Sequence, residues 1–128
     1  MAGHSSTPLL IVEQDEALLD LIATWLHDEG CDIVTCSRYE DARGYLARQT
    51  PAGLITDLRL GAYNGLQLAM LLHDRRPELP IVVISASMDS PAKNETERLG
   101  GAFLVKPIER HDFIAALGGV RRPAGELS

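Results

Sequence analysis

The sequence lacks any apolar run long enough to cross a membrane, and Met1 to Pro8 is polar, without the apolar core of a secretion signal. We therefore expect a cytoplasmic protein that makes no membrane contact. Positive charge is also scarce, since 12 Lys and Arg stand against 18 Asp and Glu, for a net charge of -6. Because nucleic-acid binding requires clustered Lys and Arg, this balance argues against direct binding of DNA or RNA.

Cysteine and histidine are too few and too scattered for thiol or zinc chemistry. Cys31 and Cys36 fall in one expected strand, at a spacing that points them to opposite faces of a sheet. We expect buried thiols in a reducing cytoplasm rather than a disulfide framework or a metal site. The histidines show no zinc-ligand spacing and no triad arrangement with a serine, and no glycine-rich phosphate loop follows the first expected strand.

What the sequence does contain is a regular alternation of short apolar runs and helical patterns. Hydrophobic residues make up 45% of the 128 residues and charged residues 23%, which is typical of one globular domain. Asp15 is the expected N-cap of the first helix, Ser37 with Glu40 a capping box, and Ser90 with Pro91 the start of a later helix. Strands are expected at 9–12, 31–36, 53–57, 81–84 and 102–105, and helices at 15–29, from 37 through 46, at 64–76, 90–99 and from 107 to 118–119.

Five strand–helix repeats with short connections predict an α/β fold, a doubly wound, five-stranded parallel sheet with helices on both faces. The run Ile81 to Ile84 is the most β-branched and is therefore the expected central strand. We place one domain at residues 8–119, after a disordered N-terminal tail at 1–7. The polar segment 120–128 is either a disordered end or the start of a linker.

Chemically useful side chains follow four of the expected strands. Glu13 and Gln14 follow the first strand, Asp57 ends the third, Ser85 follows the fourth, and Lys106 follows the fifth. Because parallel strands all point one way, these ends share one edge of the sheet, where α/β proteins bind ligands. Taken singly, Asp57 and Ser85 have a plainer interpretation as turn formers or caps, and Lys106 as a solvated lysine.

Taken together, acids, a hydroxyl and an amine at one edge suit phosphoryl chemistry. Neighbouring carboxylates repel unless a cation lies between them, and oxygen ligands with open positions suit Mg²⁺. A carboxylate held by the metal can attack phosphorus, while Lys106 and Ser85 can hold phosphoryl oxygens. The set therefore supplies a nucleophile, a divalent-ion site, a fixed cation and a hydroxyl.

Five short segments stand in order along the sequence: Leu10-Ile11-Val12-Glu13, Thr56-Asp57-Leu58-Arg59-Leu60, Asn64-Gly65-Leu66, Val83-Ile84-Ser85-Ala86 and Val105-Lys106-Pro107. Together they resemble the receiver domains of bacterial two-component response regulators, over residues 8 to 119. The family implies a flavodoxin-like sheet of strand order 2-1-3-4-5. It also implies a phosphoprotein of a phosphorelay, in which Asp57 accepts a phosphoryl group from a histidine kinase or phosphotransfer protein. Self-phosphorylation with slow autodephosphorylation is then the only enzyme activity expected.

The resemblance also implies roles for the other residues of the set. Ser85 would be the switch hydroxyl, Lys106 the phosphate-binding lysine, and the Lys106–Pro107 bond would be cis. Phe103 stands at the position of a switch aromatic that swings inward as Ser85 moves, although an aromatic in a strand is equally explained as core. The signal would leave through the fourth helix, fifth strand and fifth helix, toward a downstream protein or an output domain missing from this chain.

The acid pair that follows the first strand of receivers is altered here. Glu13 matches the first acid, but Gln14 replaces the second, which normally ligates Mg²⁺. With Asp57 and the backbone carbonyl of Arg59 as the other ligands, a neutral Gln14 predicts weakly bound Mg²⁺ and slow phosphorylation, or none. Asp15 is already expected as a helix cap. A phosphorylation switch and a pseudo-receiver that docks a partner without phosphorylation both stay open; a haloacid-dehalogenase-type phosphatase is set aside because Arg59 replaces its second Asp.

Overall fold

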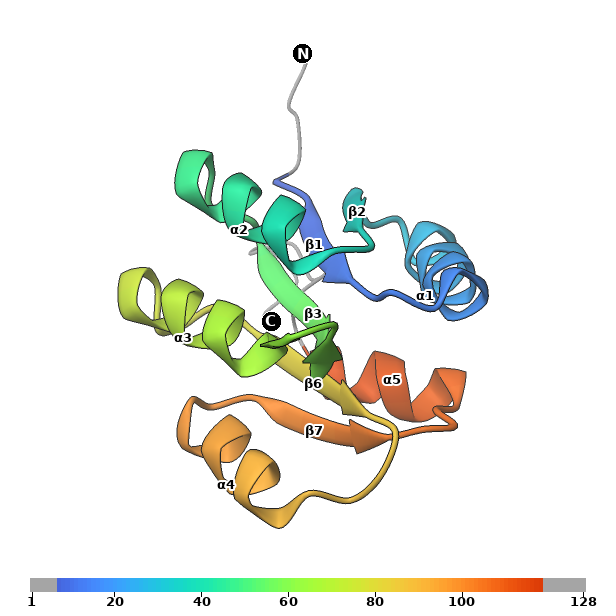
Figure 1. Ribbon diagram of the computed structural model, residues 1–128. Helices are drawn as coiled ribbons and strands as arrows, with labels where there is room; N and C mark the ends of the chain where they lie inside the picture. The colour runs from blue at the N-terminus through green and yellow to red at the C-terminus, as the bar shows by residue number, and fades with distance from the viewer. Residues whose placement is uncertain (1–6, 119–128) are drawn as a thin grey trace, which may run out of the picture.

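The computed structural model describes residues 7–118 and confirms the α/β fold (Figure 1). Five parallel strands form one sheet in the order β2-β1-β3-β6-β7, which is the order that the resemblance implies. The strand expected at the centre, β6, is internal, but β3 holds the central place. A β-branched run indicates that a strand is buried on both faces but not which position it has in the sheet. Composition therefore could not show which of β3 and β6 is central. The strands are β1 (Leu9–Val12), β2 (Ile33–Cys36), β3 (Gly53–Asp57), β6 (Ile81–Ser85) and β7 (Ala102–Val105).

Helices cover both faces of the sheet, as Figure 1 shows. One face carries α1 (Glu16–Asp28) and α5 (Arg110–Leu117), and the other carries α2 (Tyr39–Arg48), α3 (Gly65–Arg75) and α4 (Ser90–Arg98). Side chains of β1 alternate between the two apolar layers: Leu9 and Ile11 pack on the α1 and α5 side, and Leu10 and Val12 on the other. Because both faces are covered, the four residues of β1 and all five of β3 and β6 are buried.

Helix starts were predicted correctly in part. The Asp15 carboxylate caps α1, accepting from the backbone N–H groups of Ala17 and Leu18 at 3.0 and 3.3 Å. The predicted capping box of Ser37 and Glu40 is wrong. The N-cap of α2 is Arg38, which makes no side-chain cap bond, and its guanidinium lies 3.6 Å from the Glu40 carboxylate instead.

Two further helix starts differ from the prediction, because α4 begins one residue earlier and α5 begins later. The N-cap of α4 is Asp89, whose carboxylate accepts from the Ala92 N–H at 3.0 Å, so Ser90 is the first helical residue. The last helix begins at Arg110 rather than at Pro107. Strand β2 also begins late, at Ile33, so Cys31 precedes it. The two cysteines are half-buried and still contact opposite apolar layers, as their spacing predicted.

A short hairpin follows β3, where the sequence predicts only a connection between the third strand and the third helix. It pairs β4 (Arg59–Leu60) with β5 (Tyr63–Asn64), and Gly61 turns the chain with a positive φ of 63°. Strands of two residues are too short to show a period, so no pattern could have revealed them. Asn64 then caps α3 through a capping box with Gln67.

The predicted tails at 1–7 and 120–128 lie outside the described residues, apart from Thr7, and so does Gly119. Within residues 7–118, no helix has both the length and the apolar character that crossing a bilayer requires.

Gly65 lets α3 approach β3 closely. A Cβ placed there would lie 2.1 Å from the backbone oxygen of Asp57 and 2.5 Å from the Thr56 hydroxyl oxygen. That same hydroxyl donates to the Asp57 carbonyl at 2.9 Å, so the space is already filled. The first turn of α3 therefore rests directly on the backbone of Asp57.

Gly65→Ala is expected to lower the free energy of unfolding by about 1–3 kcal/mol, because the methyl group must push α3 away from β3. Gly44 is the matched control: a Cβ there meets only the flexible end of Arg48 at 3.5 Å. Gly44→Ala is therefore expected to raise the free energy of unfolding by about 0.5–1 kcal/mol. Urea unfolding compares the two variants, and a Gly65→Ala protein as stable as the wild type would contradict the close packing.

Candidate functional site

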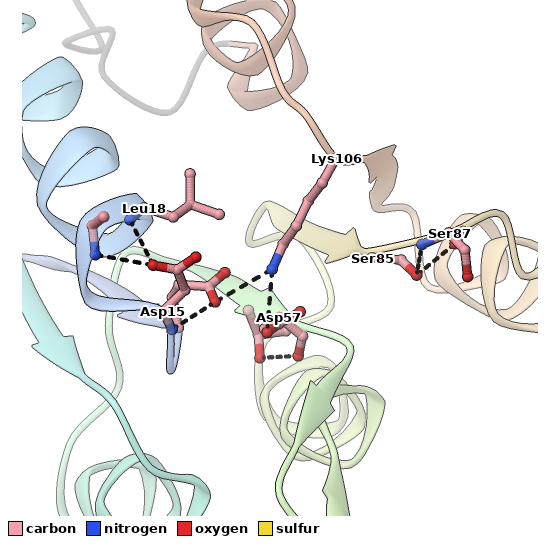
Figure 2. A network of polar contacts seen from close by, with 9 residues as sticks. Asp15, Leu18, Asp57, Ser85, Ser87 and Lys106 are labelled. Atoms are coloured by element: carbon pink, nitrogen blue, oxygen red, sulfur yellow. Dashed lines mark hydrogen bonds and ion pairs between the residues drawn. The ribbon is translucent and has the colours of Figure 1, made fainter.

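The carboxyl ends of the strands bring three of the predicted site residues together. Glu13 directly follows β1, Asp57 is the last residue of β3, and Lys106 directly follows β7. Figure 2 shows the Lys106 side chain reaching across this edge to the Asp57 carboxylate. The prediction that these strand ends meet at one edge is therefore confirmed for all three side chains.

Lys106 is placed between two buried carboxylates. Its ammonium nitrogen lies 3.4 Å from Glu13 Oε2 and 3.5 Å from Asp57 Oδ2. The Glu13 and Asp57 side chains are 1% and 7% exposed, while Lys106 is 24% exposed. One ammonium thus faces two carboxylates across long contacts, which leaves negative charge in excess when both acids are ionised.

These surroundings change the pKa of Glu13. Burial raises the pKa of Glu13 to about 7; the Asp15 backbone N–H opposes this rise, the charge of Asp57 adds to it, and Lys106 opposes it. Oε2 accepts from that N–H at 3.1 Å as well as from Lys106. The other oxygen, Oε1, is buried and has no hydrogen-bond partner. A buried acceptor without a donor is costly, so Oε1 marks a place where a cation or a proton would stabilise the fold.

This donor set fits a magnesium ion. Among the described residues, no three His, Cys, Asp or Glu side chains gather as a metal cluster. Mg²⁺, however, needs only one or two protein carboxylates, because it keeps several waters and takes phosphate oxygens as further ligands. Glu13 and Asp57 supply those carboxylates, and the unpartnered Oε1 supplies an open ligand position.

The backbone carbonyl of Arg59 is a possible third ligand. The Gly65 N–H donates to the Leu58 carbonyl at 2.8 Å, so residues 58 and 65 form a hydrogen-bonded pair across the hairpin. Antiparallel ladders alternate, so the next pair, Arg59 with Asn64, is of the non-hydrogen-bonded kind. In such a pair the carbonyl is directed away from the partner strand. The Arg59 carbonyl therefore faces outward from β5.

Gln14 directly follows Glu13 but has a different environment. It is exposed and lines a neighbouring cavity of about 240 Å³, together with Ser37, Tyr39, Leu60 and Tyr63. Asp15 is engaged as the cap of α1, as the sequence analysis expected.

The predicted switch residues occupy separate surroundings. The Ser85 hydroxyl donates to the Ser87 carbonyl at 2.6 Å, away from Asp57 in Figure 2, while its own carbonyl accepts from the Lys106 N–H at 2.8 Å. Phe103 is half-buried in β7 and packs on the α2, α3 and α4 side. The Lys106–Pro107 bond is cis, as the resemblance implied.

A family model described as the response regulator receiver domain matches residues 9–118. The transcriptional regulatory protein GlrR of Escherichia coli is 29% identical over 116 residues, which cover 90% of this chain and 26% of GlrR. The response regulator protein FleR of Pseudomonas aeruginosa is 33% identical over 120 residues, which cover 93% of this chain and 25% of FleR. The chain thus spans about a quarter of the length of these curated relatives.

Solved structures give the same fold. A response regulator from Burkholderia pseudomallei, with a phosphorylated aspartic acid, a calcium ion and citrate, matches with a TM-score of 0.77 at 21% identity, over 90% of this chain and 69% of that one. The receiver domain of the sensor histidine kinase PA1611 from Pseudomonas aeruginosa, with magnesium in its active-site cleft, matches with a TM-score of 0.74 at 18% identity, over 91% and 98% of the chains. At these identities the likeness shows the fold alone.

The raised pKa of Glu13 predicts how stability depends on pH in metal-free buffer. Because the folded protein holds this proton more tightly than the unfolded chain, its stabilising contribution is complete below about pH 4.5 and is lost as pH rises through about 7. The loss is on the order of 2–3 kcal/mol. Urea unfolding across this range in EDTA is expected to show the decline, and Glu13→Gln is expected to remove it.

Asp20→Asn, at an exposed position of α1, is the control and is expected to leave the pH dependence unchanged. Mg²⁺ is expected to restore stability at high pH, since binding to the folded state alone stabilises it. A wild-type protein whose stability is flat between pH 4.5 and 8 would contradict the assignment.

Proposed function

Because the chain belongs to the response regulator receiver domain family, we propose that it is a phosphorylation-dependent signalling switch of a two-component phosphorelay, with Asp57 as the phosphoacceptor. The observation that supports this most directly is the meeting of Asp57, Glu13 and Lys106 at one edge of the sheet. A structural lysine would not need to lie between two carboxylates that repel each other. A site that receives a phosphoryl group needs this arrangement of nucleophile and cation.

In this proposal an Asp57 carboxylate oxygen attacks the phosphorus of a phosphohistidine on a kinase or phosphotransfer protein. The O–P bond forms as the N–P bond breaks, and the imidazole leaves with the electron pair of that bond. Lys106 neutralises a phosphoryl oxygen. Glu13, Asp57 and the Arg59 carbonyl would hold a magnesium ion, which would supply further charge neutralisation at the phosphoryl oxygens. Buried strands on both sides of Asp57 exclude water.

The response begins at Ser85 and Phe103. The Ser85 hydroxyl exchanges its bond to the Ser87 carbonyl for one to the phosphoryl group, and Phe103 then moves inward. These changes alter the surface formed by α4, β7 and α5, which acts on a downstream protein or an output domain. A cytoplasmic location agrees with a kinase as donor.

A pseudo-receiver is the second candidate, and one observation favours it. Gln14 takes the place of an acid and lines a separate cavity, so the site holds two carboxylates instead of three. A domain of this kind would dock a partner without phosphorylation. The two candidates differ in one measurable property, which is modification of Asp57.

Incubation with Mg²⁺ and a small phosphodonor, followed by intact mass spectrometry, is expected to show one added phosphoryl group. Asp57→Asn is expected to abolish the addition, because an amide oxygen is a poor nucleophile toward phosphorus. Lys106→Ala is expected to slow it by on the order of a hundredfold, because it removes a charge that stabilises the transition state. Wild-type protein that stays unmodified at millimolar Mg²⁺ would favour the pseudo-receiver.

Gln14→Asp is expected to raise Mg²⁺ affinity on the order of tenfold and to speed phosphorylation, because it restores a charged oxygen ligand. It is also expected to lower the stability of the metal-free protein, because a third carboxylate adds repulsion. Gln14→Asn is the matched control, since it shortens the side chain equally without adding charge. Isothermal titration with Mg²⁺ compares them, and equal affinities for the two variants would show that residue 14 does not reach the ion.

A further inference from the structure

The hairpin after β3 is held by an aromatic stack that the proposed chemistry does not use. The Tyr39 and Tyr63 rings lie parallel, with centroids 4.3 Å apart and planes 9° apart. Tyr39 begins α2 and is 6% exposed, whereas Tyr63 is in β5 and is 44% exposed. An exposed side chain of the hairpin thus rests on a residue of the core. This contact joins the hairpin to α2, which is distant from it in sequence.

The hairpin depends on this contact because its two strands are held unequally. On β4 and just before it, Leu60 and Leu58 are 3% and 2% exposed and anchor the chain in the core. On β5, both residues are exposed, and the Tyr63 ring is what holds the strand against α2. A pair of two-residue strands has little stability of its own. Without the ring, β5 would be tied to the fold through its pairing with β4 and the start of α3.

The position of Tyr63 links the stack to the Arg59 carbonyl. Tyr63 pairs with Leu60 at the turn end of the hairpin, and Gly65 pairs with Leu58 at the other end. Arg59 lies between these two pairs. Ladder pairing on both sides fixes the rotation of its peptide groups and so the direction in which its carbonyl points. Fraying of the Leu60–Tyr63 end frees that rotation, even though the neighbouring leucines stay buried.

We propose that Tyr63 is a positioning residue for the divalent ion, acting through its stack on Tyr39 to hold the Arg59 carbonyl in place. This inference rests on the proposed function, in which Mg²⁺ is held by Glu13, Asp57 and that carbonyl. Mg²⁺ requires near-ideal octahedral geometry, so a ligand whose position is not fixed lowers the affinity of the site for the ion. Because Gln14 adds no negative charge, the Mg²⁺ affinity of this site depends more on holding its ligands in place than it would in a site with three acids.

The test is a Mg²⁺ titration of the metal-free wild type and of Tyr63→Ala, followed by the amide NMR signals of residues 57–65. Loss of the stack is expected to weaken Mg²⁺ binding about three- to tenfold, the range that such aromatic pairs contribute. Tyr63→Phe keeps the ring and is expected to retain the wild-type affinity. Amide hydrogen exchange without Mg²⁺ is expected to quicken at Leu60 and Tyr63 in Tyr63→Ala alone.

Leu21→Ala is the matched control, because Leu21 is 45% exposed on α1 and distant in sequence from the hairpin. It is expected to change neither Mg²⁺ affinity nor exchange in the hairpin. Urea unfolding of each variant separates a local effect from a general loss of stability. A weakening of Mg²⁺ binding by Leu21→Ala as large as that by Tyr63→Ala would overturn the assignment.

The remaining outcomes separate this inference from the function on which it rests. If the wild type binds Mg²⁺ and Tyr63→Ala binds it equally well, the positioning role is wrong and the proposed function stands. If Tyr63→Ala leaves hairpin exchange unchanged, the stack does not hold β5, and the role is again wrong. If the wild type fails to bind Mg²⁺ at tens of millimolar while Gln14→Asp binds it, both the Mg²⁺-dependent switch and the role of Tyr63 are overturned.

Discussion

An imbalance of charge at the carboxyl edge of the sheet is the constraint on which this structure depends. Glu13 and Asp57 are almost fully buried and share the ammonium of Lys106, at 3.4 and 3.5 Å. An ionised carboxylate is stable in a protein interior only where other groups replace the hydrogen bonds and charge screening of water. Here one ammonium, at long contact distances, must do this for two carboxylates. Burial of the incompletely compensated Glu13 carboxylate raises its pKa to about 7. Near neutral pH, a bound proton therefore takes the place of a missing cation.

The surrounding fold keeps these charged side chains from moving apart. Strands β1 and β3 are buried between two apolar layers, so neither acid can move outward without exposing core. Gly65 lets α3 rest on the Asp57 backbone, and the Lys106 N–H is tied to the Ser85 carbonyl at 2.8 Å. The free energy that holds unfavourable charges together therefore comes from packing around them and not from the site itself.

The positions of residues at the carboxyl ends of the parallel strands could be predicted from the sequence. The positions of residues fixed by particular side-chain contacts could not. Asp57 and Lys106 could be placed because a parallel sheet brings its carboxyl ends to one edge, whichever side chains they carry. The N-cap of α2 was missed because Ser37 and Glu40 match a capping pattern, while the chain enters the helix one residue later, at Arg38. The stack of Tyr39 on Tyr63 joins two elements that no periodicity connects, so only the folded chain reveals it.

In the proposed switch, the same charge imbalance drives the conformational change. A switch can respond only to interactions that differ between its two states. The Ser85 hydroxyl now donates to a neutral acceptor, the Ser87 carbonyl, at 2.6 Å. A phosphoryl group on Asp57 adds negative charge to a site where two carboxylates already share one ammonium. A hydrogen bond to a charged acceptor is roughly twice as strong as one to a neutral acceptor. The hydroxyl therefore gains by turning inward, and the loop that contains Ser87 must rearrange because the Ser87 carbonyl loses its donor.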